Sequence, residues 1–300
     1  WGWDSTIFAW ELWSELDLCG THGSSPAPQN DPRVIEWHRK MGDYIRSIDP
    51  NRHLVTTHLS GDYRITSPEL ARLPQLDHCC IDAYHSSHNP LQIVNLVRET
   101  AEHYKAYQKP VLITEFGVSS MGAGLTHLKK ELHAALWSSA CTPLGGTPLF
   151  WWWQVVEEQN FYPMYTAIAH FTAEIDYRDP QFQPVRLTPS FTGGVAVPEG
   201  QVGHVAMATP TRMIGWLFIR PCFLRQGEPL EKPLENLTLA WSGCSNAIYR
   251  TAFHDTGTGK LLKQQDARPE NGTLRISLPP VSRDIAFKVY QPGMEPPKPE

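Results

Sequence analysis

The sequence predicts an α/β domain of repeated strand and helix units, followed by a small all-β domain. Short apolar runs alternate with longer amphipathic stretches from Ile7 to about Asp176, which is the pattern of repeated βα units. Helical periodicity stops near Arg178, and prolines then cluster, which indicates a linker. The predicted boundaries are 1–178 for the first domain, 179–190 for the linker, 191–292 for a β-sandwich and 293–300 for a Pro-rich tail.

Five segments of the first domain are predicted to be parallel strands covered on both faces. Each is short, almost continuously apolar and rich in β-branched or aromatic residues, and turn-forming residues bound each of them. The segments are 7–13, 53–57, 79–84, 111–114 and 149–153.

Amphipathic helices are predicted between these strands. Asp31 is a candidate N-cap with Pro32 at the first helical position, and Asn89 and Pro90 repeat this arrangement. Thr126 is a third candidate N-cap. Residues with helical spacing follow at 34–48, 94–104, 128–136 and 167–175.

The last third of the chain carries the pattern of a β-sandwich. Its apolar segments are short, alternate with polar residues and are separated by turns. Residues 255–260 contain Gly and Lys but lack the spacing of a phosphate-binding loop, so a hairpin turn is predicted there. The predicted strands are 202–208, 213–219, 237–241, 248–253, 273–278 and 285–290.

Composition excludes several classes of function. The formal net charge is −5 without a basic stripe, which argues against a nucleic-acid partner. The densest apolar run, 149–156, is far shorter than the roughly 18 residues of a membrane span. The six cysteines show no C-x-x-C spacing, so mostly free thiols are expected rather than a disulfide scaffold or a zinc site, and the sequence leaves a single disulfide bridge open.

Two glutamates stand directly after predicted strands, where a parallel barrel places its catalytic groups. Glu15 follows the first predicted strand and Glu115 the fourth. Retaining cleavage of a glycosidic bond needs one protonated and one ionised carboxyl group about 5 Å apart. Such glutamates can instead bind a metal or form structural ion pairs, and that alternative stays open on these residues alone.

The segments around both glutamates resemble motifs of clan A glycoside hydrolases, especially cellulase-like members of family five. Phe-Ala-Trp-Glu-Leu-Trp-Ser-Glu, ending at Glu15, resembles the fourth-strand motif of that family. Pro-Val-Leu-Ile-Thr-Glu-Phe-Gly, containing Glu115, resembles the seventh-strand nucleophile motif. The resemblance covers roughly residues 1–176 and implies a (β/α)8 TIM-barrel fold, present here from about strand 4 to helix 8.

The resemblance also implies the chemistry and a set of site residues. Glu15 is expected to be the acid/base, Glu115 the nucleophile of a double displacement, and Tyr84 a phenol that donates a hydrogen bond to the nucleophile. The expected substrate is a β-linked poly- or oligosaccharide, and no metal or organic cofactor is expected. Sugar contacts are expected from Ser14, His58, Tyr84, His85 and Trp153.

Departures from the family pattern leave a second interpretation open. Ser14 stands where the family usually has an Asn, and strands one to three of the barrel are expected to be missing from a truncated chain. Open strand edges expose unpaired backbone groups, which makes activity of this chain doubtful. The alternatives are a non-catalytic carbohydrate-binding or degenerate barrel, and a metal-dependent hydrolase that uses His58, His85 and His88. The sugar, the linkage, the mode of cutting and the compartment stay open, although an extracellular or periplasmic location fits the substrate class.

Overall fold

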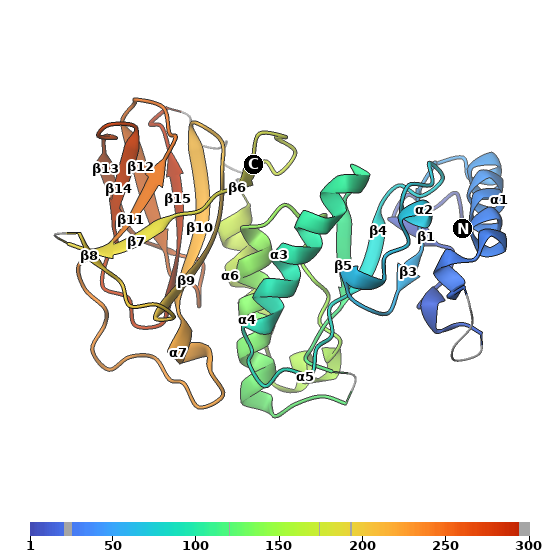
Figure 1. Ribbon diagram of the computed structural model, residues 1–300, viewed down its shortest axis with the longest axis horizontal. Coiled ribbons are helices and arrows are strands. Elements are labelled where there is room, and N and C mark those ends of the chain that lie inside the picture. Colours follow the sequence, from blue (N-terminus) through green and yellow to red (C-terminus); the bar gives the residue numbers. More distant parts are fainter. Residues whose placement is uncertain (21–25, 120, 174, 193, 294–300) are drawn as a thin grey trace. The chain divides into compact units, whose positions relative to one another are not determined.

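The computed structural model describes residues 1–20, 26–119, 121–173, 175–192 and 194–293 (Figure 1). The chain divides into two compact units. Unit 1 comprises Trp1–Ser86, Asn95–Gly122 and Leu144–Trp151, and unit 2 comprises Ser87–Val94, Ala123–Pro143 and Trp152–Glu300. The second unit groups helices of the predicted first domain with the C-terminal strands, so the boundary at residue 178 stays a prediction.

Unit 1 is built around short parallel strands that follow one another along the chain. Strand β1 (Ala9–Glu11) pairs with β2 (Leu54–Thr56), and β4 (Cys79–Asp82) lies between β3 (His58–Leu59) and β5 (Val111–Glu115). The His58 amide donates to the Trp13 carbonyl at 2.9 Å, which continues the pairing of the first two segments beyond β2. The first four predicted strands and their parallel direction are therefore confirmed.

The fifth predicted strand, 149–153, is only partly present. Phe150 forms an isolated parallel bridge with Phe116, and the Trp151 amide donates to the Phe116 carbonyl at 2.9 Å. Trp153 was predicted to close this strand, but it is instead the first residue of helix α5 (Trp153–Glu158). Three consecutive tryptophans suit a strand and a buried helix alike, so the apolar pattern could not locate the change of backbone.

Two longer helices contribute to unit 1. Helix α1 (Pro32–Ile48) begins as predicted, with the Asp31 side chain accepting from the Arg33 amide. Most of α3 (Gln92–Tyr104) also belongs to this unit. The shorter helices are η1 (Leu16–Leu18), η2 (Pro28–Asn30), η3 (Tyr63–Ile65), α2 (Pro68–Ala71) and η4 (Lys105–Tyr107).

Unit 2 contains the helices α4 (Leu125–Ala140), α5 and α6 (Tyr162–Thr172), and the short α7 (Arg220–Phe223). The predicted cap of α4 is wrong: Gly124 is the N-cap, and Thr126 lies inside the first turn. The ring of Trp137 in α4 is buried, contacts Phe171 in α6 and donates to the Thr256 carbonyl at 3.2 Å. Aromatic packing thus joins these helices to the strands of the same unit.

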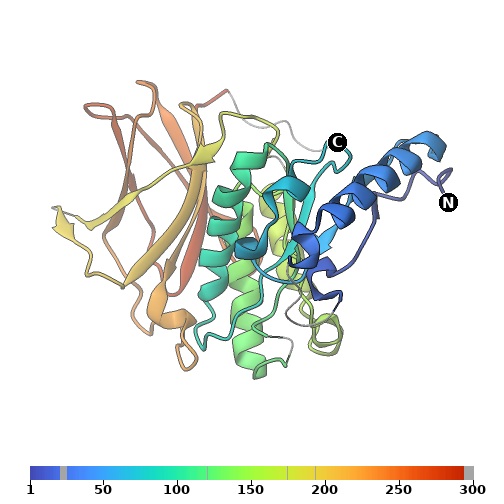
Figure 2. The ribbon, with the colours of Figure 1, turned by 45° about the vertical axis from the view of Figure 1, so that its right-hand side comes forward.

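The strands of unit 2 form two antiparallel sheets, which Figure 2 shows as separate layers. The six-stranded sheet has the order β13-β12-β15-β10-β9-β6, and the four-stranded sheet has the order β14-β11-β7-β8. Trp241 of β11 and Tyr249 of β12 place their ring centroids 5.4 Å apart, so side chains of the two sheets touch. The strands are β6 (Gln183–Pro184), β7 (Thr188–Phe191), β8 (Val195–Ala196), β9 (Val202–Ala208), β10 (Arg212–Ile219), β11 (Leu237–Ser242), β12 (Tyr249–His254), β13 (Leu261–Ala267), β14 (Thr273–Ser277) and β15 (Asp284–Tyr290).

All six predicted C-terminal strands are confirmed within a residue or two, and four others were missed. Strands β6 and β7 lie largely in the predicted linker, because Pro184 and Pro189 were interpreted as signs of irregular chain. Pro184 is tolerated because β6 lies at a sheet edge. Strand β13 pairs with β12 across the 255–260 turn, which confirms the predicted hairpin.

The state of the cysteines and the lengths of the apolar helices can be compared with the sequence predictions. The six cysteines are free thiols, as their spacing predicted. Across the described residues, no helix is long and apolar enough to cross a membrane.

Candidate active site

The ends of three strand segments in unit 1 bring three carboxyl groups together. Glu115 is the last residue of β5, Asp82 is the last residue of β4, and Glu15 follows β1 at the start of η1. One carboxylate oxygen of each residue lies within 4.8 Å of those of the other two. The two glutamates predicted to act together are therefore neighbours, although 100 residues separate them in sequence.

Tyr84 contacts the candidate nucleophile as predicted. Its hydroxyl donates to Glu115 Oε2 at 2.8 Å. Burial and the hydrogen bond to Glu115 raise the pKa of Tyr84 far above its usual range. The phenol is consequently neutral at physiological pH and remains a donor to the carboxylate.

Glu15 has an unusual main-chain conformation. Its φ and ψ are both 49°, in the left-handed region that residues other than glycine seldom adopt. The Glu15 amide donates to His58 Nδ1 at 3.4 Å, and the Ser14 hydroxyl lies 3.4 Å from the same nitrogen. Main-chain strain in this region is typical of sites where the fold fixes a functional group.

His58 is held from its other side by Asp82, a residue to which the sequence assigned no function. His58 Nε2 lies 2.7 Å from Asp82 Oδ1, and both side chains are almost completely buried. Because both ring nitrogens of His58 have protein neighbours, the structure favours a supporting role over the predicted sugar contact. The signal available in sequence was the polar end of the third predicted strand, Asp82-Ala83-Tyr84.

The buried carboxyl group of Asp82 retains a proton unusually well. Burial raises its pKa to about 7, against the opposing influence of His58, while nearby Glu115 and Glu15 favour the protonated form. Burial alone would lower the pKa of His58, but the adjacent Asp82 and the charges of Glu11 and Glu115 outweigh it and raise that pKa. The protonation of each partner therefore depends on that of the other.

The remaining predicted sugar contacts lie in different places. Ser14 is exposed, whereas His85 is half-buried and donates its amide to the Val118 carbonyl. Trp153 is 64% exposed at the start of α5, which belongs to unit 2, whereas the carboxyl cluster belongs to unit 1. The predicted place of Trp153 at the end of a strand is wrong, because Trp153 is the first residue of helix α5.

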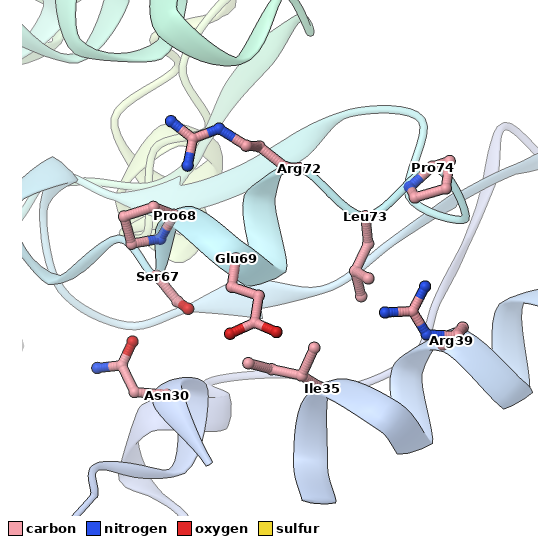
Figure 3. Close-up of a pocket in the computed structure, with 9 residues that line it drawn as sticks. All are labelled: Asn30, Ile35, Arg39, Ser67, Pro68, Glu69, Arg72, Leu73 and Pro74. Atoms are coloured by element: carbon pink, nitrogen blue, oxygen red, sulfur yellow. The ribbon is translucent and has the colours of Figure 1, made fainter. Parts of the chain in front are cut away.

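Cavities among the described residues of unit 1 differ in their relation to these carboxyl groups. One of about 600 Å³ is lined by residues of η2, α1 and the α2 region, including Arg39, Glu69 and Arg72 (Figure 3). No residue of the carboxyl cluster lines it. A second, of about 580 Å³, is lined among others by Trp13 and Leu16, which flank the Ser14 and Glu15 pair in sequence.

The histidine-based metal site receives no support from the geometry. Among the residues that the structure describes, the potential ligands grouped within 4.8 Å are Glu15, Asp82 and Glu115, with no histidine among them. His58 is already engaged with Asp82, and His88 is exposed. Three oxygens at this spacing suit a hard cation, but a pair of carboxyl groups at strand ends suits glycoside cleavage equally well.

Known glycoside hydrolases are similar to this chain in part of their sequence. Residues 28–139 match the family model described as "Glycosyl hydrolases family 2, TIM barrel domain". Mannan endo-1,4-beta-mannosidase 1 of Arabidopsis thaliana is 30% identical over 157 residues, which cover 43% of this chain and 36% of that protein. The chain is a relative of the clan A glycoside hydrolases.

Further clan A relatives agree with this assignment. Mannan endo-1,4-beta-mannosidase 5 of Arabidopsis thaliana is 32% identical over 145 residues, covering 39% of this chain and 32% of that protein. The chain thus spans about a third of the length of these curated relatives.

Solved structures share the fold. A glycoside hydrolase family 5 protein from Bacteroides vulgatus superposes with a TM-score of 0.54 at 12% identity, covering 86% of this chain and 60% of that one. A second glycoside hydrolase has a TM-score of 0.52 at 14% identity, covering 89% and 63%. The predicted resemblance and the kinship with TIM-barrel glycosidases are confirmed.

Proposed function

We propose that this chain carries the catalytic pair of a retaining glycoside hydrolase that cleaves β-linked glycans. Glu115 is the nucleophile and Glu15 is the acid/base. The observation that carries the proposal is the approach of their carboxylate oxygens to within 4.8 Å, at the ends of strand segments.

The reaction consists of two displacements at the anomeric carbon. In the first, a Glu115 oxygen bonds to that carbon while the glycosidic bond breaks, and Glu15 gives its proton to the leaving oxygen. In the second, Glu15 takes a proton from water, the water oxygen bonds to the anomeric carbon, and the bond to Glu115 breaks. Both carboxyl groups finish as they began, and no cofactor takes part.

The separation of the two groups supports retention over inversion. Inverting enzymes keep their carboxyl groups about 6.5–9.5 Å apart to admit a water molecule, whereas retaining enzymes keep them about 5–5.5 Å apart. Carboxylate oxygens within 4.8 Å leave little room for water between nucleophile and sugar. The hydrogen bond from Tyr84 gives further support, because it orients the Glu115 carboxyl group.

The substrate class follows from the relatives and from the aromatic surface. Two relatives carry the name mannan endo-1,4-beta-mannosidase, so β-1,4-mannan is the first polysaccharide to test. Trp13 is 41% exposed and lines a cavity of about 580 Å³, and an indole face of this kind can stack on the apolar face of a sugar. Ser14 and His85, which belong to the same unit as the two glutamates, remain proposed sugar contacts.

The architecture proposed with this function is strands 4 to 8 of a (β/α)8 barrel followed by a β-sandwich. The parallel segments from β1 to Phe150 support the first part, and two touching antiparallel sheets support the second. Within the described part of the chain, β1 pairs with β2 alone. The second candidate function is a glycan-binding domain without turnover, and it is favoured by Ser14, which stands where the family usually has an Asn beside the acid/base.

Activity assays on three variants test the proposal. Glu115→Gln is expected to lower the rate on β-1,4-mannan and on aryl β-glycosides to background, and Glu15→Gln is expected to lower it about 10²–10⁴-fold. Glu99→Gln, an exposed glutamate of the same unit, serves as the control and should keep the wild-type rate. Background rates in all four proteins, with glycan binding intact, would support the binding domain instead. Loss of the rate on adding a chelator would point to a metal-dependent hydrolase.

A further inference from the structure

We infer that Asp82 and His58 form a positioning pair that holds the main chain of Glu15 in place for proton transfer. This inference rests on the proposed function, in which Glu15 is the acid/base. Neither residue needs to touch the sugar for this role, because the pair acts through the backbone at Ser14 and Glu15.

A continuous chain of contacts links the buried carboxylate to the acid/base. Asp82 Oδ1 lies 2.7 Å from His58 Nε2, and His58 Nδ1 lies 3.4 Å from both the Glu15 amide nitrogen and the Ser14 hydroxyl. The side chains of His58 and Asp82 are 3% and 0% exposed. The pair is therefore shielded from solvent and connects β4 to the segment that follows β1.

The direction of the hydrogen bonds selects one form of the imidazole ring. An amide N–H can only donate, so His58 Nδ1 must be the acceptor when it bonds the Glu15 amide. The proton of the neutral ring then lies on Nε2 and is donated to Asp82. A buried carboxylate that fixes the tautomer and orientation of a histidine is a known means of holding a functional group.

Glu15 has a conformation that requires such support. Its left-handed backbone is unfavourable for a side chain with a Cβ atom, and no side chain caps the short helix η1 that follows. If the amide lost its acceptor, the backbone could relax toward a commoner region and move the carboxyl group. The distance to the leaving oxygen, on which proton transfer depends, would then change.

Asp82 also has a feature that simple packing does not explain. Its Oδ2 atom is buried and has no hydrogen-bond partner among the described residues. A buried, half-satisfied carboxyl group lowers the stability of a fold, so its presence beside Glu15 and Glu115 indicates a functional constraint.

The test compares substrates that differ in their need for an acid. An aryl β-glycoside with a dinitrophenolate leaving group departs without a proton, whereas one with a 4-methylphenolate leaving group needs general acid assistance. The measured quantity is kcat/KM, which reports the first displacement. We expect Asp82→Asn and His58→Gln to lower it about 10–100-fold for the poor leaving group, within the range for general acid catalysis. For the good leaving group the loss should stay below about threefold.

Asp49→Asn provides a matched control from the same unit. Asp49 and His53 form a second buried pair, 2.8 Å apart, which contacts neither catalytic glutamate. A variant that only damages folding should lower kcat/KM by the same factor for the good and the poor leaving group. Asp49→Asn is expected to show this equal loss. If Asp82→Asn also lowers both equally, or lowers neither, the inference is wrong. Because Glu115→Gln abolishes both reactions when the proposed function holds, the two failures are distinguishable.

A second measurement does not depend on turnover. Nitrogen-15 NMR of the His58 ring at alkaline pH should show the proton on Nε2 in the wild type. A wild-type ring with its proton on Nδ1 would overturn the inference even if no substrate were found.

Discussion

Three carboxyl groups that lie within 4.8 Å of one another have different surroundings. Glu115 accepts a hydrogen bond from Tyr84, Asp82 is buried against His58, and Glu15 stands on a left-handed backbone. Like charges at this spacing repel, so the cluster favours keeping at least one proton. Burial, together with the nearby Glu115 and Glu15, favours the protonated form of Asp82.

The hydroxyl of Tyr84 is expected to contribute to the rate through its hydrogen bond to Glu115. Tyr84→Phe removes a donor to a charged acceptor, a contact that contributes about 1.5–3 kcal/mol, so kcat/KM should fall about 10–100-fold. Tyr63→Phe is the matched control, because Tyr63 donates to exposed Glu99 in the same unit and should not matter for the rate. Equal rates for wild type and Tyr84→Phe would contradict the role assigned to this phenol.

The coupled titration of Asp82 and His58 predicts how stability depends on pH. Both pKa values are raised in the folded protein, that of Asp82 to about 7, so the folded state binds more protons than the unfolded chain. Stability should therefore fall as pH rises from about 4, the unfolded pKa of Asp, through about 7. Urea denaturation at a series of pH values should show this slope in the wild type and a flatter one in Asp82→Asn. Identical slopes would show that the pair does not titrate as described.

The sequence predicted those strands best whose residues are apolar and also buried in the folded protein. Strand β9 was predicted with its observed bounds, because its short, mostly apolar run matches a strand in a packed sheet. Strand β13 was missed, because Leu261–Ala267 is mostly exposed and its central residues, Lys263 to Asp266, are polar. Cross-strand pairing with β12, and not hydrophobic periodicity, specifies β13 as a strand.

The candidate site was predictable in part for similar reasons. Glu15, Glu115 and Tyr84 each stand at the end of a strand pattern, so the sequence alone predicts their positions. The sequence alone does not predict the pairing of Asp82 with His58, because a hydrogen bond between the ends of separate strands depends on the register of those strands. The helical start of Trp153 depends likewise on packing that an apolar run of three tryptophans does not encode.

A buried polar network ties helix α4 to strand β15 within unit 2 and leads to a stability prediction. Asp284 accepts from His133 at 2.6 Å, Arg283 at 2.8 Å, Thr256 at 2.8 Å and Trp216 at 2.9 Å. Despite complete burial, contacts with His133 and Arg283 hold the pKa of Asp284 well below its usual range. Asp284→Asn should lower the free energy of unfolding by about 1–3 kcal/mol, because a neutral amide accepts more weakly from these donors and leaves one of them without an acceptor.

Urea denaturation at neutral pH measures this loss. Asp266→Asn is the control, because Asp266 pairs with Arg250 at the surface and should change stability little. The depressed pKa also means that the contribution of Asp284 is present above about pH 4 and is lost only as pH falls through its folded value. A midpoint for Asp284→Asn equal to that of the wild type would contradict the stabilising role of the network.

At the scale of the whole molecule, the two compact units differ in what they contribute. Unit 1 holds the carboxyl cluster, and unit 2 holds the antiparallel sheets together with the helices packed on them. The family model matches residues 28–139, which include the ends of β4 and β5 in unit 1, and the chain spans about a third of the length of the curated relatives. The catalytic proposal therefore stands on the geometry of a few strand ends and not on the complete length of any relative.

Covalent trapping tests the central claim most directly. A 2-deoxy-2-fluoro-β-glycosyl fluoride should lose fluoride as a Glu115 oxygen bonds to its anomeric carbon, and the fluorine at carbon 2 should slow hydrolysis of the resulting ester. Mass spectrometry of peptides from the treated protein should then locate one sugar adduct on Glu115, absent from Glu115→Gln. Hydrolysis of a β-glycan without any such adduct, or with the adduct on another carboxyl group, would contradict the double displacement at Glu115.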